Sequence, residues 1–189
     1  MYKQTVPLIL ASKSPRRQEL LQAMGLKFNV LFKDVEESFP EYLSPAEIAC
    51  YIAEKKALAF SDEGQESLVI TADTIVVYDG EIMGKPANAE GARRMLGRLS
   101  GTVHQVYTGV SLVHKTKLHT FYDMTEVWFR EITTEEIDHY INNYNPFDKA
   151  GSYGIQDWLG FVAVEKITGS YTNVMGLPTE KLYSALSNF

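Results

Sequence analysis

The sequence predicts an α/β fold built on a mixed β-sheet, and three observations support this prediction. Strand–helix units occupy the first third of the chain, hairpin signals occupy the middle, and a helical pattern ends it. This order mixes parallel and antiparallel connections, which fits neither a doubly wound parallel sheet nor a barrel. Hydrophobic residues make up 45% of the 189 residues, enough for one sizeable core or two small lobes that share the sheet.

The first strand–helix unit is expected at the N-terminal end. The apolar run 8–11 predicts a short strand, and a polar turn leads from it into a helix over 16–24. Ser14 suits the N-cap, Pro15 the first helical position and Gly25 the C-terminal cap. The turn therefore joins a strand directly to a helix N-terminus.

A second strand and a second helix follow. Apolar residues alternate with polar ones over 28–32, which indicates a strand, and an acidic loop comes after it. Ser44 and Glu47 form a capping-box pattern with Pro45 at the first helical position, so we expect a helix from there to about Phe60. The positions that this helix is expected to bury are Ile48, Ile52 and Leu58.

The rest of the chain is expected to form hairpins and capped helices. Apolar runs at 68–72 and 75–77 flank Asp73 and Thr74, and the pair Asp79–Gly80 is a strong hairpin-turn signal with a return strand at 82–83. The remaining predicted elements are a helix over 88–99, an antiparallel pair over 103–113 and 118–129, a helix over 133–144, a strand over 161–167 and a helix over 179–186.

Composition narrows the class of protein. The formal net charge of −6 argues against binding to duplex DNA or to an acidic membrane face. No apolar run approaches the roughly 18 residues of a membrane span, and the N-terminus does not resemble a signal peptide. Cys50, the only cysteine, lies among apolar neighbours in a helical pattern and is expected to be a small core residue. We therefore expect a cytoplasmic protein that binds neither duplex nucleic acid nor a membrane.

The turn between the first strand and the first helix is a candidate phosphate site. A helix N-terminus presents free N–H groups, Ser12 and Ser14 add hydroxyls, and Arg16 and Arg17 add guanidinium groups that bind phosphate oxygens in pairs. The alternative is an ordinary capped helix with two solvated arginines.

Asp73 is a candidate catalytic group because it interrupts an apolar stretch. A carboxylate there is costly unless it is paired, hydrogen-bonded or bound to a metal, so it suits a metal ligand or a general base. The alternative is an aspartate that caps or ends a strand. Glu36 and Glu37 in the acidic loop could complete a set of oxygen ligands for magnesium or manganese, or could simply be solvated.

Two lysines and a glycine-containing segment are further candidates for the functional site. Lys56 falls on the second helix, and Lys85 is followed by a proline that restricts its backbone. Most lysines are solvated, so each is weak evidence alone. The segment 148–156 places two glycines among small and polar residues and ends at Gln156, whose amide both donates and accepts, as recognition of a nucleobase edge requires.

Taken in order, six segments closely resemble the Maf family of nucleotide pyrophosphatases. The segments are LASKSPRRQELL at 10–21, ADTIV at 72–76, GKP at 84–86, LSG at 99–101, DKAGSYGIQ at 148–156 and VMGLP at 174–178. The resemblance spans nearly the whole chain. Ser152 stands where the family more often has alanine, which is a small departure.

The resemblance implies a fold similar to the inosine triphosphate pyrophosphatases, with an elongated mixed sheet and a cleft between two lobes in one domain over 1–189. It also implies hydrolysis of a nucleoside triphosphate to the monophosphate and pyrophosphate with a divalent cation, Mg²⁺ or Mn²⁺, as house-cleaning of the nucleotide pool. Matched by motif, Asp73 corresponds to the catalytic base. The residues that correspond to the phosphate- and metal-handling set are Ser12, Arg17, Glu37, Lys56 and Lys85, with Glu37 and Asp73 as the metal ligands.

Three further positions match the thymidine/uridine triphosphate branch of the family, namely Arg16, Thr74 and Gln156. A sister branch that prefers 7-methylguanosine triphosphate has an aromatic residue at the position of Arg16. Two alternatives stay open: that sister activity, and a nucleotide-sensing regulator of cell division and septum formation, which would not need Asp73. The sequence also leaves open whether the nucleotide is an ordinary or a modified pyrimidine, and an aromatic content of 12% is compatible with a homodimer.

Overall fold

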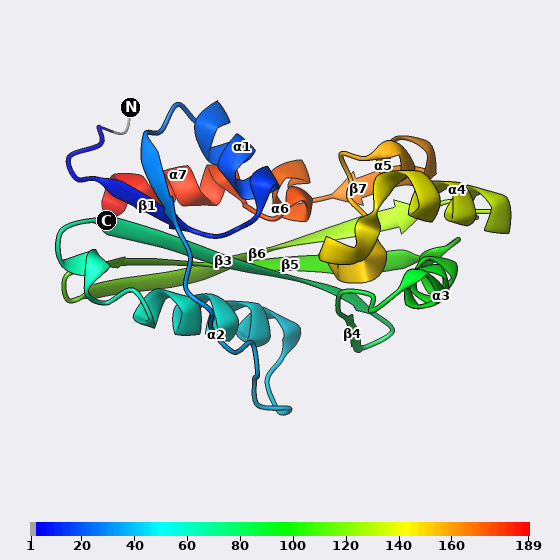
Figure 1. The fold of residues 1–189 in the computed structure, drawn as a ribbon, viewed down its shortest axis with the longest axis horizontal. Coiled ribbons are helices and arrows are strands. Elements are labelled where there is room, and N and C mark those ends of the chain that lie inside the picture. The colour runs from blue at the N-terminus through cyan, green and yellow to red at the C-terminus, as the bar shows by residue number, and fades with distance from the viewer. Residues whose placement is uncertain (1–2) are drawn as a thin grey trace. The chain divides into compact units, whose positions relative to one another are not determined.

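The computed structural model describes residues 3–189 and confirms the α/β fold with a mixed sheet (Figure 1). Within those residues the sheet has seven strands in the order β2–β1–β3–β5–β6–β7, with β4 paired to β3. The strands are β1 (Leu8–Ala11), β2 (Phe28–Leu31), β3 (Leu68–Tyr78), β4 (Glu81–Met83), β5 (Val103–His114), β6 (Lys117–Phe129) and β7 (Val164–Thr168).

The helices flank these strands. They are α1 (Pro15–Ala23), α2 (Pro45–Leu58), α3 (Ala89–Leu99), α4 (Thr134–Tyr144), α5 (Trp158–Ala163), α6 (Tyr171–Met175) and α7 (Thr179–Asn188), with 3₁₀ turns η1 (Glu63–Gln65), η2 (Pro146–Asp148) and η3 (Ala150–Ser152). No helix among residues 3–189 combines the length and the apolar character that a membrane crossing requires.

The chain divides into two compact units. The first unit contains Met1–Asp73, Thr108–Asp123 and Gly176–Phe189, and the second contains Thr74–Tyr107 and Met124–Met175. The description of the chain as one domain over 1–189, and the cleft between two lobes, stay predictions.

In the first unit, β1 runs parallel to both β2 and β3, with Leu8 opposite Phe28 on one side and opposite Leu68 on the other. In Figure 1, α1 and α7 lie on one side of β3 and α2 lies on the other. The strand–helix reading of the N-terminal third is therefore confirmed, including the helix that begins at Pro15.

Helix α2 packs very closely on the sheet of the first unit. A Cβ atom at Gly109 of β5 would overlap the backbone of Ala49, and the Thr71 hydroxyl donates to the Ala53 carbonyl at 2.6 Å. Close approach requires small residues on the contacting helix face, and Ala49, Ala53 and Ala57 are all fully buried there. Small residues therefore set the distance between α2 and the strands.

The predicted start of α2 is confirmed, but one predicted core position is wrong. Ser44 and Glu47 form the capping box, and the helix ends at Leu58. Leu58 is 55% exposed, whereas Ile48 and Ile52 are buried as expected. Position 58 lies about 100° past Ala57 around the helix, which takes it off the buried face. Cys50 also differs from the prediction, because it is only half-buried.

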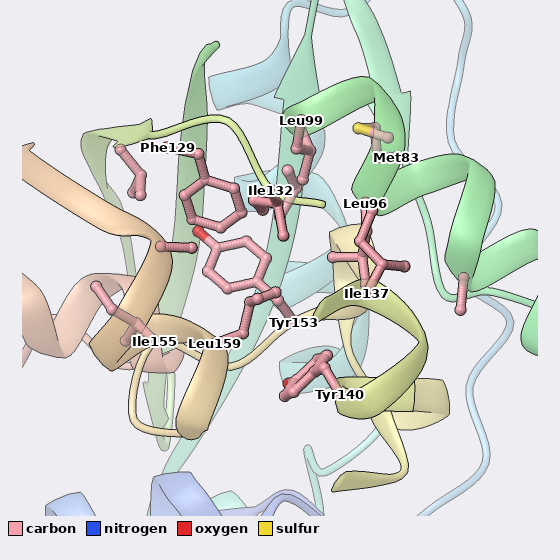
Figure 2. Packing of buried hydrophobic residues seen from close by; sticks show 14 of the residues in the cluster. Met83, Leu96, Leu99, Phe129, Ile132, Ile137, Tyr140, Tyr153, Ile155 and Leu159 are labelled. Atoms are coloured by element: carbon pink, nitrogen blue, oxygen red, sulfur yellow. The ribbon is translucent and has the colours of Figure 1, made fainter. Parts of the chain in front are cut away.

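The second unit is organised around an aromatic cluster (Figure 2). Figure 2 shows the Tyr153 ring beside the Phe129 ring, and their centroids are 4.9 Å apart in an edge-to-face arrangement. The His104 ring packs edge-on against both, and its Nε2 lies 2.7 Å from the Tyr153 hydroxyl. The aliphatic residues of α3 that pack on this cluster are Ala92, Leu96 and Leu99.

Several local predictions in this unit are confirmed. Asp79 and Gly80 both have positive φ, 51° and 76°, as a type I′ turn between β3 and β4 requires. The helices predicted over 88–99 and 133–144 are also present, as α3 and α4. In the structure Asn88 caps α3 by accepting from the Gly91 N–H, and Thr133 and Glu136 form a capping box on α4.

The strand predicted over 161–167 is wrong in its first half. Residues Trp158–Ala163 form α5, and only Val164–Thr168 form β7, which pairs antiparallel with β6. The helix buries Leu159 and Ala163 at a spacing of four and leaves Phe161 75% exposed. A continuous apolar run does not distinguish these periods, and Gly160 permits the helix because a Cβ there would overlap the Ile155 backbone.

The close packing of α2 makes Gly109→Ala destabilising. The added methyl group would meet backbone atoms of Ala49 and Cys50 rather than a flexible side chain, so we expect a loss of about 1–3 kcal/mol in the free energy of unfolding. Urea denaturation, monitored by circular dichroism, measures this change in the free energy of unfolding. Gly97→Ala on α3 is the control: a Cβ there meets no atom within 4 Å, and removing a helical glycine should add about 0.5–1 kcal/mol. Equal stability of Gly109→Ala and the wild type would contradict the packing described for α2.

The buried His104 predicts acid sensitivity. Burial lowers the pKa of His104 to about 3 from its usual 6.5, so below pH 6.5 the unfolded chain takes up a proton that the folded chain does not. Stability should therefore fall as the pH drops from 6.5 toward 3, by at most roughly 5 kcal/mol. Urea titrations across this range should show a shallower loss for His104→Gln than for the wild type, whereas His119→Gln, at an exposed position, should keep the wild-type slope.

Candidate active site

The turn between β1 and α1 is organised around the Ser12 hydroxyl. Ser12 is only 6% exposed, and its Oγ accepts from the Ser14 N–H and from Arg17 Nη1, each at 3.2 Å. Ser14 occupies the N-cap of α1 and Pro15 follows it. Because Oγ accepts in both bonds, its own proton is available for a further acceptor, such as a phosphate oxygen.

Arg17 links this turn to the C-terminal part of the first unit. Its Nε donates to the Gly176 carbonyl at 2.8 Å. Burial lowers the pKa of Arg17; the Asp73 and Glu37 carboxylates oppose that effect, and the neighbouring Arg16 guanidinium adds to it. The arginine therefore lies in the electrostatic field of both carboxylates that the sequence singled out.

Lys56 holds the two carboxylates together. Its Nζ lies 2.7 Å from Asp73 Oδ1 and 2.7 Å from Glu37 Oε1. The Lys56 side chain is 17% exposed and that of Asp73 12%, so the pair is largely removed from water. The alternative that Lys56 is solvated like most lysines is wrong, because this ammonium is the counter-ion of a buried carboxylate.

Asp73 lies inside a strand rather than at its end. Strand β3 continues without a break from Leu68 to Tyr78, and Asp73 is 9% exposed within it. The alternative reading as a strand-capping aspartate is therefore wrong. Successive side chains leave a strand on opposite faces, so Thr74 projects to the face opposite Asp73.

The two carboxylates fit a divalent cation that is shared with a phosphorylated substrate. Asp73 and Glu37 supply hard oxygen donors, and the contact with Lys56 uses one oxygen of each, Oδ1 and Oε1. Among residues 3–189 no group of three or more His, Cys, Asp or Glu side chains forms a complete protein cage for a metal. Mg²⁺ is usually held by one or two carboxylates plus phosphates and water, and this donor set suits that mode.

The structure thus brings together five of the predicted residues in the first unit. These residues are Ser12, Arg17, Glu37, Lys56 and Asp73. Ser14 and Arg16 belong to the same turn and helix and are half-buried. The other three, Thr74, Lys85 and Gln156, belong to the second unit.

In the second unit, two of the motif segments lie against each other. The Gly151 N–H donates to the Gly84 carbonyl at 3.1 Å, which joins the segment 84–86 to the segment 148–156. Gly151 has a φ of 66°, and a Cβ there would lie 3.0 Å from Val76. Lys85, next to this contact, is exposed.

The Gln156 side chain has partners that the sequence analysis did not identify. Its Nε2 donates to Asp157 Oδ1 at 3.1 Å, and Asp157 Oδ2 accepts from the Tyr140 hydroxyl at 2.9 Å. Asp157 directly follows the motif and could have been suspected for that reason. Tyr140 could not, since it lies 17 positions from Asp157 and carries no local signal.

The fold and the grouping of these residues define a protein of the Maf class. The family model described as Maf-like protein matches residues 7–189, and the chain belongs to this family.

Individual relatives are identical to this chain at about half of the aligned positions. A protein from Phocaeicola vulgatus named dTTP/UTP pyrophosphatase is 52% identical, over 95% of this chain and 94% of that protein. A protein of the same name from Bacillus cytotoxicus is 51% identical, over 96% and 94%. The solved structure of a HAM1 protein from Coxiella burnetii aligns with a TM-score of 0.53 at 15% identity, covering 98% of this chain and all of that one, and this likeness concerns the fold alone.

The Lys56 ion pairs predict how charge removal affects stability. Lys56→Met leaves Asp73 buried without its counter-ion, so we expect the free energy of unfolding to fall by about 1–3 kcal/mol, less than for a fully buried pair because the Glu37 side chain is 50% exposed. Adding Asp73→Asn to Lys56→Met should recover part of the loss. Urea denaturation of the two single variants and the double variant measures the coupling, and strictly additive effects would show that the two side chains do not interact.

Proposed function

We propose that this chain hydrolyses dTTP and UTP to the nucleoside monophosphate and pyrophosphate. The observation that carries the proposal is the Lys56 ammonium between the Asp73 and Glu37 carboxylates, with Arg17 in their field, in a chain whose relatives at about half identity bear the name dTTP/UTP pyrophosphatase. Phosphoryl-type transfer needs positioned cations and a carboxylate near the attacking water, and this group supplies both.

In this proposal Asp73 is the general base. One of its oxygens bonds Lys56, and the other accepts a hydrogen bond from a water molecule. The water oxygen attacks the α-phosphorus in line, the bond from that phosphorus to the α–β bridging oxygen breaks, and pyrophosphate leaves. The proton of the water passes to Asp73 and then to solvent.

The cationic and hydroxyl side chains stabilise the charge of the phosphates. Ser12, Ser14 and Arg17 act from the turn before α1, where the helix N-terminus also favours an anion. Lys56 and Lys85 act as further cations. A divalent cation, Mg²⁺ or Mn²⁺, held by Glu37 and Asp73 would neutralise phosphate charge when it is bound.

Base selection is assigned to Arg16, Thr74 and Gln156, the positions that match the thymidine/uridine triphosphate branch. Gln156 has an amide of the kind that pairs with a nucleobase edge, and Arg16 stands where the 7-methylguanosine triphosphate branch has an aromatic residue. The substrate can be an ordinary or a modified pyrimidine nucleotide.

The proposal extends to the setting of the reaction. A net charge of −6 favours a free nucleotide over duplex nucleic acid as the ligand. We place the activity in the cytoplasm, as house-cleaning of the nucleotide pool, with a homodimer as the proposed assembly.

The proposal is tested by pyrophosphate release with Mg²⁺ or Mn²⁺ across canonical and modified nucleoside triphosphates. Wild-type protein should hydrolyse dTTP and UTP fastest, and Asp73→Asn should lower kcat by about 10²–10³ because a positioned charge at the reacting atoms is lost. Asp138→Asn, which alters an exposed ion pair with Arg93 in the second unit, is the control and should keep wild-type rates.

Three other results would contradict parts of this proposal. Near wild-type turnover by Asp73→Asn would remove that residue as the base. Tight triphosphate binding without turnover would favour the nucleotide sensor. A preference for 7-methylguanosine triphosphate would assign the chain to the sister branch.

A further inference from the structure

The two ends of the Gln156 amide have different surroundings. Nε2 donates to Asp157 Oδ1 at 3.1 Å, whereas Oε1 is buried and accepts no hydrogen bond from residues 3–189. A carboxylate only accepts hydrogen bonds, so the amide must face Asp157 through its N–H₂ group. Its carbonyl oxygen is therefore left as an unused, buried acceptor.

Asp157 is itself held from its other side. Its Oδ2 accepts from the Tyr140 hydroxyl at 2.9 Å and lies 3.6 Å from Lys149 Nζ. Tyr140 is fully buried, burial raises the pKa of its hydroxyl, and its oxygen accepts from the Gly154 N–H at 3.1 Å. The hydroxyl therefore keeps its proton and its direction, and Asp157 does not rotate freely.

The absence of a side chain at Gly154 leaves space for the Gln156–Asp157 pair. A Cβ at position 154 would lie 2.7 Å from Asp157 Oδ2 and 2.7 Å from Gln156 Nε2, too close for either atom to stay in place. The Asp157 N–H also donates to the Gly154 carbonyl at 3.0 Å, which closes a tight turn. The backbone thus leaves room for both side chains of the pair.

We propose that Asp157 is a positioning residue that fixes the Gln156 amide, so that its carbonyl oxygen accepts from the ring N–H of a uracil or thymine base. Uracil and thymine carry a donor at N3 between two carbonyls, whereas cytosine has an unprotonated acceptor at N3. A free glutamine could turn its amide over and donate to cytosine. Asp157 opposes that rotation because it would place two acceptors, Oε1 and Oδ1, against each other.

This inference rests on the proposed function, and it adds Asp157 as the residue that makes the site prefer uracil or thymine over cytosine. Its first test uses wild-type protein and compares kcat/KM for UTP, CTP and N3-methyluridine triphosphate. Both CTP and the methylated nucleotide lack the N3–H donor, so each should be hydrolysed less efficiently than UTP by about tenfold, the value of one hydrogen bond. Equal efficiency with UTP and its N3-methyl derivative would overturn the proposal.

The second test replaces Asp157 by asparagine. The asparagine amide can donate as well as accept, so Gln156 can adopt either orientation and the UTP-to-CTP ratio of kcat/KM should fall by about tenfold. The change should appear mainly as a lower KM for CTP, with kcat for UTP little affected, because the base and not the reacting phosphorus is repositioned. A ratio that stays at the wild-type value would contradict the role of Asp157.

Two controls separate positioning from general damage. Asp148→Asn removes a carboxylate that lies 2.8 Å from the same lysine, Lys149, and should leave the UTP-to-CTP ratio unchanged. In a Gln156→Ala background, Asp157→Asn should no longer alter the ratio, since it acts through the glutamine. A further change in that background would show that Asp157 acts by another route. Thermal unfolding midpoints check that each variant is folded.

Failure of the inference can be told apart from failure of the proposed function. Turnover of UTP with no N3–H dependence overturns the role of Asp157 and leaves the pyrophosphatase intact. If wild-type protein shows no turnover, the same UTP-to-CTP comparison is made on dissociation constants by titration calorimetry. A protein that binds neither nucleotide would remove both proposals.

Discussion

The Lys56 ammonium between Asp73 and Glu37 is the interaction on which the candidate site depends. Asp73 occupies an internal position of a strand whose residues are mostly buried, and a carboxylate there is tolerated only with a close cation. The paired cation comes from α2, so this helix has to lie near enough to the sheet for the Lys56 side chain to reach Asp73. Gly109 and the alanine face of α2 provide that proximity, which links an otherwise ordinary packing detail to the chemistry of the site.

Charge balance follows from the same arrangement. The chain is acidic overall, yet Lys56 forms ion pairs with both Asp73 and Glu37, and Arg17 lies in the electrostatic field of the same two carboxylates. Without a ligand, the carboxylates neutralise cations that would otherwise repel one another in a partly buried place. A triphosphate brings its own negative charge, so the same cations then have anionic partners from two sources. A divalent cation suits that surplus of oxygen donors, because Mg²⁺ usually takes only one or two carboxylates from a protein and its other ligands from phosphates and water.

The sequence predicts what is local and misses what is distant. The Ser44–Glu47 capping box, the Asp79–Gly80 turn and the class of fold follow from short-range patterns in the sequence, and each is confirmed. The helix over 158–163 is missed for another reason, because a continuous apolar run does not distinguish a helix from a strand. The contacts within the site are equally hard to predict. Residue types and motif resemblance point to Asp73 and Lys56, but their 2.7 Å contact joins residues 17 positions apart in the sequence. The hydrogen bond from Arg17 to Gly176 joins residues 159 positions apart.

The magnitudes of the two kinds of interaction explain why the proposed roles are divided as they are. Loss of a positioned charge at a reacting phosphate costs about 10²–10³ in rate, whereas one neutral hydrogen bond discriminates by about tenfold. Phosphate handling can therefore rely on a few charged groups such as Lys56 and Arg17. Base selection through Gln156 alone would be weak, so it needs additional positions, and a glutamine that could turn over would lose even its modest contribution. A fixed amide is the physical condition under which a single side chain can distinguish uracil from cytosine, and Asp157 and Tyr140 provide the contacts that fix it.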